Sequence, residues 1–218
     1  MLYDYRLTMF LDHIKRIIIF ILTGYLVSCS ILRTELEPDR NTLLTLNEGA
    51  IIGVNNGKTY QWLGIQYGSI PNSSFRWRKA TKPEKWDGVY EALEFGNTCV
   101  QKGSLINTAK RRNWGDIVGS EDCLYLNIWA PKDTFDDLSQ RKPVMVWIHG
   151  GSNVSGNADF YDPSELVSSQ DVIVVSINYR LGPFGWFRHP DVTSTAENPE
   201  DQSGNYGNID SIQALEWV

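Results

Sequence analysis

The stretch VMVWIHGGSNVSG, residues 144–156, places an apolar strand directly before a run of small residues. The segment Val144–Ile148 is continuously apolar, which is typical of a strand that is buried on both faces. His149, Gly150 and Gly151 follow it, and their presence has two interpretations. Glycine is the usual residue of a tight turn that needs a positive φ. Backbone N–H groups at the end of a strand can also bind an anion that forms during a reaction.

A helix and a second buried strand follow this stretch. The segment YDPSELVSSQ (Tyr161–Gln170) has Asp162 as N-cap, Pro163 at the first helical position and Glu165 three residues after the cap. This order of residues indicates the start of a helix. VIVVSIN (Val172–Asn178) is a further apolar run. A strand, a helix and a strand in succession predict a crossover unit with two parallel strands.

The segments upstream predict antiparallel strands. GAIIGVNNGKTYQWLGIQY (Gly49–Tyr67) contains two apolar runs around an Asn-Asn-Gly turn at residues 55–57, which is a strong hairpin signal. CLYLNIWAP (Cys123–Pro131) alternates apolar side chains and ends at a proline. The fold class is therefore α/β, with antiparallel strands that lead into a mostly parallel sheet with crossover helices.

The last segment, NIDSIQALEWV, predicts a helix whose apolar stripe contains Ile209, Ile212, Ala214, Leu215 and Val218. Asp210 and Glu216 are interpreted as a cap residue and a residue of the solvated face rather than as acid catalysts. The pattern contains no Gly or Pro stop signal and no later strand to which the helix could cross over. We therefore expect the chain to be the N-terminal portion of a longer α/β protein.

Composition excludes several classes of function. The 218 residues include 20 Lys and Arg against 26 Asp and Glu, a net charge of -6, and no basic cluster is longer than Lys110–Arg112. Such a chain lacks the basic footprint of a nucleic-acid-binding protein. The sequence contains no cluster of metal-ligating residues and no phosphate-binding loop, so no metal and no cofactor are predicted. A small uncharged molecule is a better candidate ligand than a polyanion.

Residues 1–29 are predicted to be an export signal. Lys15 and Arg16 precede the apolar run Ile17–Val27, and this order of a basic and an apolar region is typical of a signal peptide. The run is short for a membrane span, which needs about 20 apolar residues. A start at Met9 would give a more compact basic region. Residues 30–46 are polar and weakly patterned, which favours a tether or a loosely packed entry segment.

The end of this signal has two interpretations. LVSC (Leu26–Cys29) resembles a bacterial lipobox, in which Cys29 would carry the lipid and would be the only attachment to a membrane. The alternative is ordinary cleavage near Ser30 and secretion. Either way the protein is predicted to be exported, as a cell-envelope lipoprotein or as a secreted or periplasmic protein. Cys99 and Cys123 would then be an even pair in an oxidising compartment, the alternative being two buried thiols.

Several segments in a fixed order resemble the type-B carboxylesterase family, which includes the cholinesterases. The resemblance covers residues 47–218, a partial carboxylesterase domain. The matching segments are LGIQYG (Leu63–Gly68), Phe75–Gln101, EDCLYLNIWAP (Glu121–Pro131), PVMVWIHGGS (Pro143–Ser152), VVSINYRLGPFGW (Val174–Trp186) and GNYGNIDSIQALEWV (Gly204–Val218).

The resemblance implies an α/β-hydrolase fold and hydrolysis of a small-molecule ester by serine acyl transfer. In this family the matching loop forms the oxyanion hole, so Gly151 and Ser152 are expected to supply N–H donors and Gly150 to allow the turn. A further donor would come from the residue after the nucleophile. The resemblance also implies a disulfide between Cys99 and Cys123 and a structural ion pair between Arg76 and Glu121. His149 belongs to the motif and is expected to be structural rather than a general base.

The sequence departs from the family pattern in the loop and at the nucleophile. Ser152 stands where a third glycine is usual, and Asn153 stands where an aromatic residue is common. The sequence contains no Gly-x-Ser-x-Gly elbow, which the resemblance places about twenty residues past Val218. The chain would then carry the oxyanion-hole half of a site without its catalytic Ser, acid and His, and would be silent alone. The alternatives are a non-catalytic interaction domain of the adhesion type with the same fold, or an inactive fragment.

Overall fold

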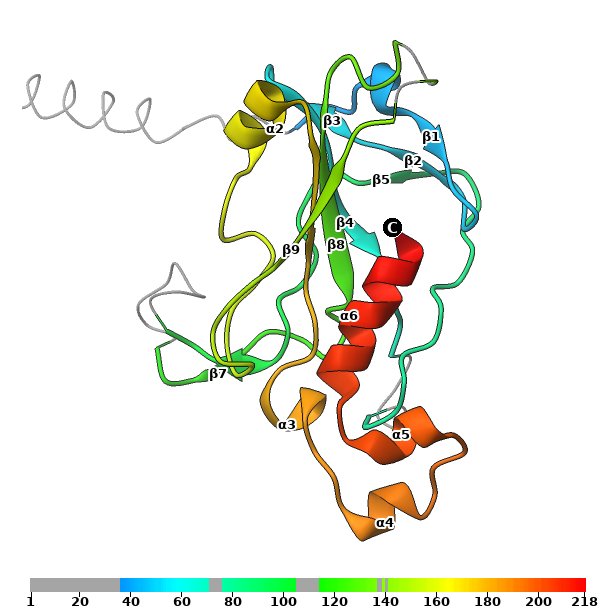
Figure 1. The fold of residues 1–218 in the computed structure, drawn as a ribbon, viewed down its shortest axis with the longest axis vertical. Helices are drawn as coiled ribbons and strands as arrows, with labels where there is room; N and C mark the ends of the chain where they lie inside the picture. The colour runs from blue at the N-terminus through cyan, green and yellow to red at the C-terminus, as the bar shows by residue number, and fades with distance from the viewer. Residues whose placement is uncertain (1–35, 71–75, 105–113, 137–138, 140) are drawn as a thin grey trace, which may run out of the picture. The chain divides into compact units, whose positions relative to one another are not determined.

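The computed structural model describes residues 36–70, 76–104, 114–136, 139 and 141–218 (Figure 1). The predicted signal peptide and Cys29 lie outside the described residues. Residues Glu37–Val218 form one compact unit. Residues 40–46 of the segment predicted as a tether or entry segment belong to this unit, and Thr42 is fully buried. The Thr42 hydroxyl accepts a hydrogen bond from the N–H of Gly53 at 2.7 Å, which ties this entry segment to the sheet.

Strands predominate in the first part of the described chain, and helices predominate in its last part. The strands are β1 (Leu44–Thr45), β2 (Ala50–Ile52), β3 (Val54–Asn55), β4 (Thr59–Gln66), β5 (Val89–Glu91), β6 (Gln101–Lys102), β7 (Ile117–Val118), β8 (Tyr125–Pro131), β9 (Val144–Ile148) and β10 (Ile173–Ile177). The helices are η1 (Arg40–Thr42), α2 (Ser164–Gln170), α3 (Gly182–Gly185), α4 (Pro190–Thr193), α5 (Pro199–Ser203) and α6 (Tyr206–Trp217).

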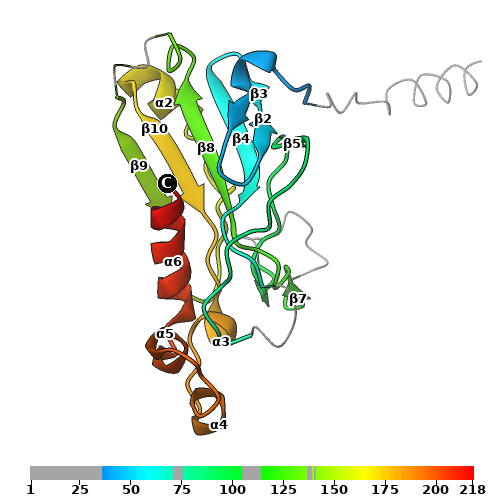
Figure 2. The ribbon, with the colours of Figure 1, turned by 90° about the vertical axis from the view of Figure 1, so that its right-hand side faces the viewer.

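The central sheet has five strands in the order β3-β4-β8-β10-β9, which Figure 2 shows side by side. The neighbours from β3 to β10 are antiparallel, and β10 and β9 are parallel. The predicted α/β architecture is confirmed, with antiparallel strands first and then a strand-helix-strand unit. Within the described residues the sheet is mixed rather than mostly parallel. The remaining strands form two separate smaller sheets, β1-β2-β5 and β6-β7.

Local sequence explains the two best-predicted elements. The hairpin of β3 and β4 turns at Asn56 and Gly57, where Gly57 has φ +92° and the Asn56 side chain accepts from the N–H of Thr59 at 2.8 Å. Helix α2 begins at Ser164, one residue later than the sequence predicts. The Asp162 carboxylate still accepts a hydrogen bond from the N–H of Ser164, at 2.9 Å.

Helices α2 and α6 cover opposite faces of the central sheet. Successive side chains of a strand point to opposite faces, and two separate clusters of buried apolar residues follow this rule. The larger cluster contains Val175 of β10 and Ala214 of α6. The smaller contains the adjacent Val174 together with Val167 of α2. The short helices α3, α4 and α5 lie at the end of the sheet opposite α2 (Figure 1).

The prediction that β9 is buried on both faces is wrong for the described residues. β9 is an edge strand, and Val144, Met145 and Ile148 are each between 46% and 49% exposed. β10, its parallel neighbour, is buried at four of its five positions. The apolar composition of β9 is therefore that of a central strand, although no described strand pairs with its outer edge.

The helix near the end of the chain is confirmed as α6, but its buried face differs from the predicted stripe. Ile212 and Leu215 are 55% and 51% exposed. Ala214, which also belonged to the predicted stripe, is buried, and the rest of the buried side is formed by Tyr206, Gly207, Asp210 and Gln213. Asp210 is thus neither a cap nor solvated, because its position faces the interior and finds a charged partner there. In the described part of the chain, no helix combines the length and apolar character that a membrane crossing requires.

Candidate active site

The loop that follows β9, residues 149–156, lies at the end of the sheet where α3 begins. The parallel strands β9 and β10 both end there, and carboxyl ends of parallel strands are the usual place for ligand sites in α/β folds. The Tyr179 hydroxyl donates to the carbonyl of His149 at 2.7 Å. The N–H of Gly182, the first residue of α3, donates to the carbonyl of Asn153, also at 2.7 Å.

The loop backbone enters the left-handed region repeatedly. Gly151 has φ +119° and Gly156 has φ +122°, and a Cβ at these positions would lie 2.0 Å from the Ser155 carbonyl oxygen and 2.3 Å from His149 Nδ1, respectively. Ser152 and Asn153 have φ of 55° and 61°. Ser152 therefore occupies a conformation that favours the third glycine of the family pattern, at a strain of about 1–2 kcal/mol. Nothing lies within 4 Å of a Cβ at Gly150.

Internal hydrogen bonds fix the two peptide groups that carry the expected donors. The ring of His149 contacts the carbonyl oxygen of Gly150 through Nδ1 at 2.9 Å. The carbonyl of Gly151 accepts from the N–H groups of Val154 and Ser155 at 3.1 and 3.2 Å. In a trans peptide the N–H points opposite to the C=O. The N–H groups of Gly151 and Ser152 therefore point away from these internal contacts.

Neither of these two N–H groups has a hydrogen-bond acceptor among the described residues. Both residues are exposed. Adjacent N–H groups in a left-handed turn form a concave site for an anion. The arrangement can thus stabilise a negatively charged oxygen without any positively charged side chain.

His149 supports the loop from inside. It is 4% exposed, and its ring stacks on Tyr179 with ring centroids 4.4 Å apart. Burial lowers the pKa of His149. The Gly150 carbonyl and the charge of Asp159 raise this pKa, but their effect is smaller than that of burial. Nε2 has no hydrogen-bond partner among the described residues. A neutral ring that carries its proton on Nδ1 fits this environment, because Nδ1 then donates to Gly150.

The exit of the loop is held by buried polar side chains that the sequence analysis missed. Gln101 exchanges two hydrogen bonds with the backbone of Gly156, at 2.8 and 2.9 Å. The N–H and carbonyl of Ala158 are bound by the side chains of Asn178 and Ser176, each at 2.8 Å. Ser176 interrupts the apolar run of β10 and Asn178 directly follows it, and these two polar residues were the available signal. Gln101 gave none, because it lies far away in the sequence.

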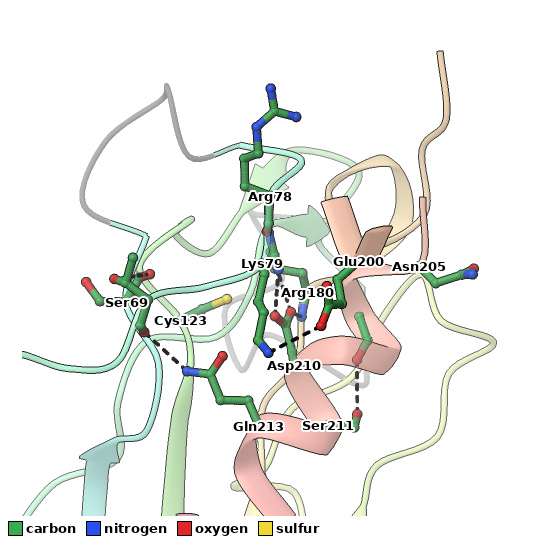
Figure 3. A network of polar contacts seen from close by, with 12 residues as sticks. Ser69, Arg78, Lys79, Cys123, Arg180, Glu200, Asn205, Asp210, Ser211 and Gln213 are labelled. Atoms are coloured by element: carbon green, nitrogen blue, oxygen red, sulfur yellow. Dashed lines mark hydrogen bonds and ion pairs between the residues drawn. The ribbon is translucent and has the colours of Figure 1, made fainter. Parts of the chain in front are cut away.

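The segment after β10 is fixed by a buried ion pair (Figure 3). The guanidinium of Arg180 contacts the Asp210 carboxylate at 2.6 and 2.7 Å, with both side chains almost fully buried. Arg180 also donates to the carbonyl of Arg78 at 2.8 Å. This pair joins α6 to the residues that precede α3. The sequence did not reveal it, because a charge after a strand and a carboxylate in a helix are each ordinary.

The structure brings together the other residue pairs that the resemblance suggested. Cys99 and Cys123 form a disulfide. Arg76 and Glu121 form an ion pair in which Nε donates to Oε2 at 2.8 Å, and both side chains are about one third exposed. The Arg76 guanidinium also lies over the ring of Phe184, 5.3 Å from its centroid. Phe184 belongs to α3, so this pair lies beside the loop-supporting segment.

The described residues contain the oxyanion-hole candidates but no nucleophile-base pair. Of the two histidines, His149 contacts Gly150 and His189 pairs with Asp191 at 3.5 Å. Neither ring has a hydrogen bond to a serine or threonine hydroxyl within the described ranges. No group of three or more His, Cys, Asp or Glu side chains that could hold a metal ion occurs in that part of the chain.

Comparison with known sequences gives a consistent result. The sequence model of the carboxylesterase family matches residues 40–218. The para-nitrobenzyl esterase of Bacillus subtilis is 37% identical over 178 residues, which are 81% of this chain and 34% of that protein. The acylcarnitine hydrolase of Mus musculus is 36% identical over 190 residues, 84% of this chain and 32% of that protein.

Solved structures are similar in the same way. A PNB esterase superposes with a TM-score of 0.68 at 35% sequence identity, over 82% of this chain and 34% of that one. A carboxylesterase of Geobacillus stearothermophilus gives a TM-score of 0.67 at 35% identity, over 81% of this chain and 33% of that one. The chain thus spans about a third of the length of the proteins that it matches.

Proposed function

The chain belongs to the carboxylesterase family, and from this premise we propose that the protein hydrolyses carboxylic esters by acyl transfer to a serine. The residues described above would supply the oxyanion hole. When the serine oxygen attacks the ester carbonyl, that carbonyl oxygen gains a negative charge in the tetrahedral intermediate. The N–H groups of Gly151 and Ser152 would then donate to it. The loss of one such donor typically lowers kcat by about 10²–10³-fold.

The reacting serine, its acid and its histidine are placed outside the 218 residues in this proposal. The sequence contains no Gly-x-Ser-x-Gly elbow, and the two described histidines have other partners. The N–H after the nucleophile would be a further donor to the same oxygen. The chain described here would contribute preorganised dipoles, which stabilise charge without reorganising during the reaction.

Small uncharged esters are the proposed substrate class. The net charge of -6 and the lack of a long basic cluster argue against anionic polymers. The named relatives support an ester, since one is called a para-nitrobenzyl esterase and another an acylcarnitine hydrolase. We place the site outside the cytoplasm, because residues 1–29 have the order of an export signal.

The observation that carries the proposal is the pair of outward N–H groups at Gly151 and Ser152, neither of which has an acceptor in the part of the chain that the structure describes. The test is hydrolysis of p-nitrophenyl butyrate by the full-length protein, together with labelling by a fluorophosphonate that reacts with activated serines. We expect saturable turnover and one label per chain. Absence of both would favour the non-catalytic interaction domain.

Attachment through Cys29 is tested separately. We propose that the LVSC segment directs lipidation of Cys29, which would anchor an otherwise exported protein. The protein should enter the detergent phase in a Triton X-114 partition, and a Cys29→Ser variant should not. Recovery of the unaltered protein in the aqueous phase would instead support cleavage near Ser30.

A further inference from the structure

Gln101 binds the oxyanion-hole loop from a distant part of the chain. Its side-chain nitrogen donates to the Gly156 carbonyl at 2.9 Å, and its side-chain oxygen accepts from the Gly156 N–H at 2.8 Å. The pair of bonds resembles the exchange between two residues of an antiparallel sheet. Gln101 is 4% exposed and lies 55 residues before Gly156. Solvent therefore competes little for these two bonds.

Gly156, which Gln101 binds, packs directly against the peptide group that carries one of the two donors of the loop. A Cβ at Gly156 would lie 2.3 Å from His149 Nδ1 and 2.5 Å from the Gly150 carbonyl oxygen, so its Cα packs directly on both. That carbonyl shares a peptide group with the N–H of Gly151. A movement of Gly156 would loosen one side of the packing around the ring of His149 and around this peptide. The position of Gly156 thus helps to fix the direction of the Gly151 N–H.

Gln101 is itself anchored to the rest of the fold. It lies two residues after Cys99, which is joined by a disulfide to Cys123, just before β8. The Gln101 nitrogen also donates to the Cys99 carbonyl at 3.0 Å. The same amide nitrogen therefore bonds both to the residue that carries the disulfide and to the loop.

We propose that Gln101 is a positioning residue of the oxyanion hole, which acts by holding Gly156 against His149 and the Gly150–Gly151 peptide. This role rests on the proposed function, since it concerns the same site. Glutamine suits the position chemically. It must donate to two carbonyls and accept from one N–H, and a carboxylate of the same shape would face both carbonyls without a donor. Asparagine has the same groups on a side chain that is one methylene shorter.

The test is the steady-state kinetics of Gln101→Met with p-nitrophenyl butyrate in the full-length protein. We expect kcat to fall by about 10–100-fold while KM changes by less than about threefold, because the misplaced donors act on the intermediate rather than on the bound ester. The oxyanion forms in both acylation and deacylation, so kcat reports on it whichever step is slower. The kcat of Gln101→Asn should lie between that of the unaltered protein and that of Gln101→Met.

Gln213→Met is the matched control. Gln213 is also buried, at 7% exposure, and its nitrogen also donates to two backbone carbonyls, those of Tyr67 and Thr81, at 3.1 and 3.2 Å. Among the described residues, its side chain has no hydrogen bond to the loop. The Gln213→Met variant removes a comparable amide and should keep kcat within about twofold of the unaltered protein.

The outcomes separate the two claims. An unaltered kcat in Gln101→Met, or an equal loss in Gln213→Met, would overturn the role of Gln101 and leave the proposed function standing. Unaltered protein that shows no turnover would overturn both. If Gln101→Met cannot be obtained folded, the test rests on Gln101→Asn. A kcat of Gln101→Asn equal to that of the unaltered protein would then count against the proposal.

Discussion

At the scale of single residues, the three glycines of the loop differ in how strictly glycine is required. Gly151 and Gly156 both have positive φ, and each would bring a Cβ against backbone or ring atoms. Gly150 has free space around it, so a small side chain is sterically tolerated there. Ser152 accepts the left-handed conformation at φ 55° in spite of its Cβ. The sequence could identify the glycines as a turn, but it could not show which of them is sterically obligatory.

The first prediction compares two alanine substitutions. Gly151→Ala should lower the free energy of unfolding by about 2–3 kcal/mol, because its Cβ meets the Ser155 carbonyl in a disfavoured backbone conformation. Gly150→Ala should change it by less than about 1 kcal/mol. Urea unfolding of the full-length protein measures both. Equal losses in the two variants would mean that the loop has another conformation.

The second prediction concerns the pH dependence of stability. Burial lowers the pKa of His149 in the folded state, so the unfolded chain binds the proton more tightly. Stability from this group is therefore complete above its unfolded pKa of about 6.5 and is lost as the pH falls below it. Unfolding free energies between pH 7.5 and 5 should decline less steeply in His149→Phe than in the unaltered protein. Parallel curves would contradict the buried neutral ring.

At the scale of elements, helix α6 shows where a sequence pattern fails. Its helical character follows from the spacing of apolar residues, yet its buried face carries Asp210 and Gln213, while Ile212 and Leu215 are exposed. Tertiary contacts decide the face: Asp210 meets Arg180, and Gln213 meets the backbone of Tyr67. These partners lie 30 and 146 residues away, beyond any local periodicity.

The third prediction follows from the buried ion pair. Asp210→Asn should lower the free energy of unfolding by about 3–5 kcal/mol, because it leaves the guanidinium of Arg180 buried without a countercharge. Glu165→Gln removes a partner of the exposed pair between Lys58 and Glu165 and should have no measurable effect. Chemical unfolding of both variants makes the comparison. A small loss in Asp210→Asn would show that water reaches this pair.

The fourth prediction concerns the disulfide that anchors the strand of Gln101. Cys99 and Cys123 are separated by 24 residues, and closing a loop of this length stabilises a fold by about 3–4 kcal/mol through the unfolded chain. Double substitution to serine should lower the free energy of unfolding by roughly this amount. Cys29→Ser, which lies outside the described fold, is the control. Equal stability of all three proteins would argue against the bridge.

At the scale of the whole molecule, the predictable and unpredictable parts divide by sequence distance. Local chemistry explains the succession of strands along the chain and the hairpin at Asn56 and Gly57. It also explains the helix after Asp162 and the turn at Gly150 and Gly151. The mixed pairing of the sheet, the edge position of β9 and the buried partners of the loop depend on contacts between distant segments. The cysteine count already suggested Cys99–Cys123, with two buried thiols as the alternative, and the family resemblance implied the same bridge. The pairing of Arg76 with Glu121 came from the resemblance alone.

The most direct measurement is a crystal structure of the full-length protein after reaction with a phenyl trifluoromethyl ketone. Such a ketone forms a tetrahedral adduct with a reactive serine and leaves an oxyanion in the site. That oxygen should lie about 2.7–3.1 Å from the backbone nitrogens of Gly151 and Ser152. An adduct whose oxygen points elsewhere, or a protein that forms no adduct, would contradict the assignment of this loop as the oxyanion hole.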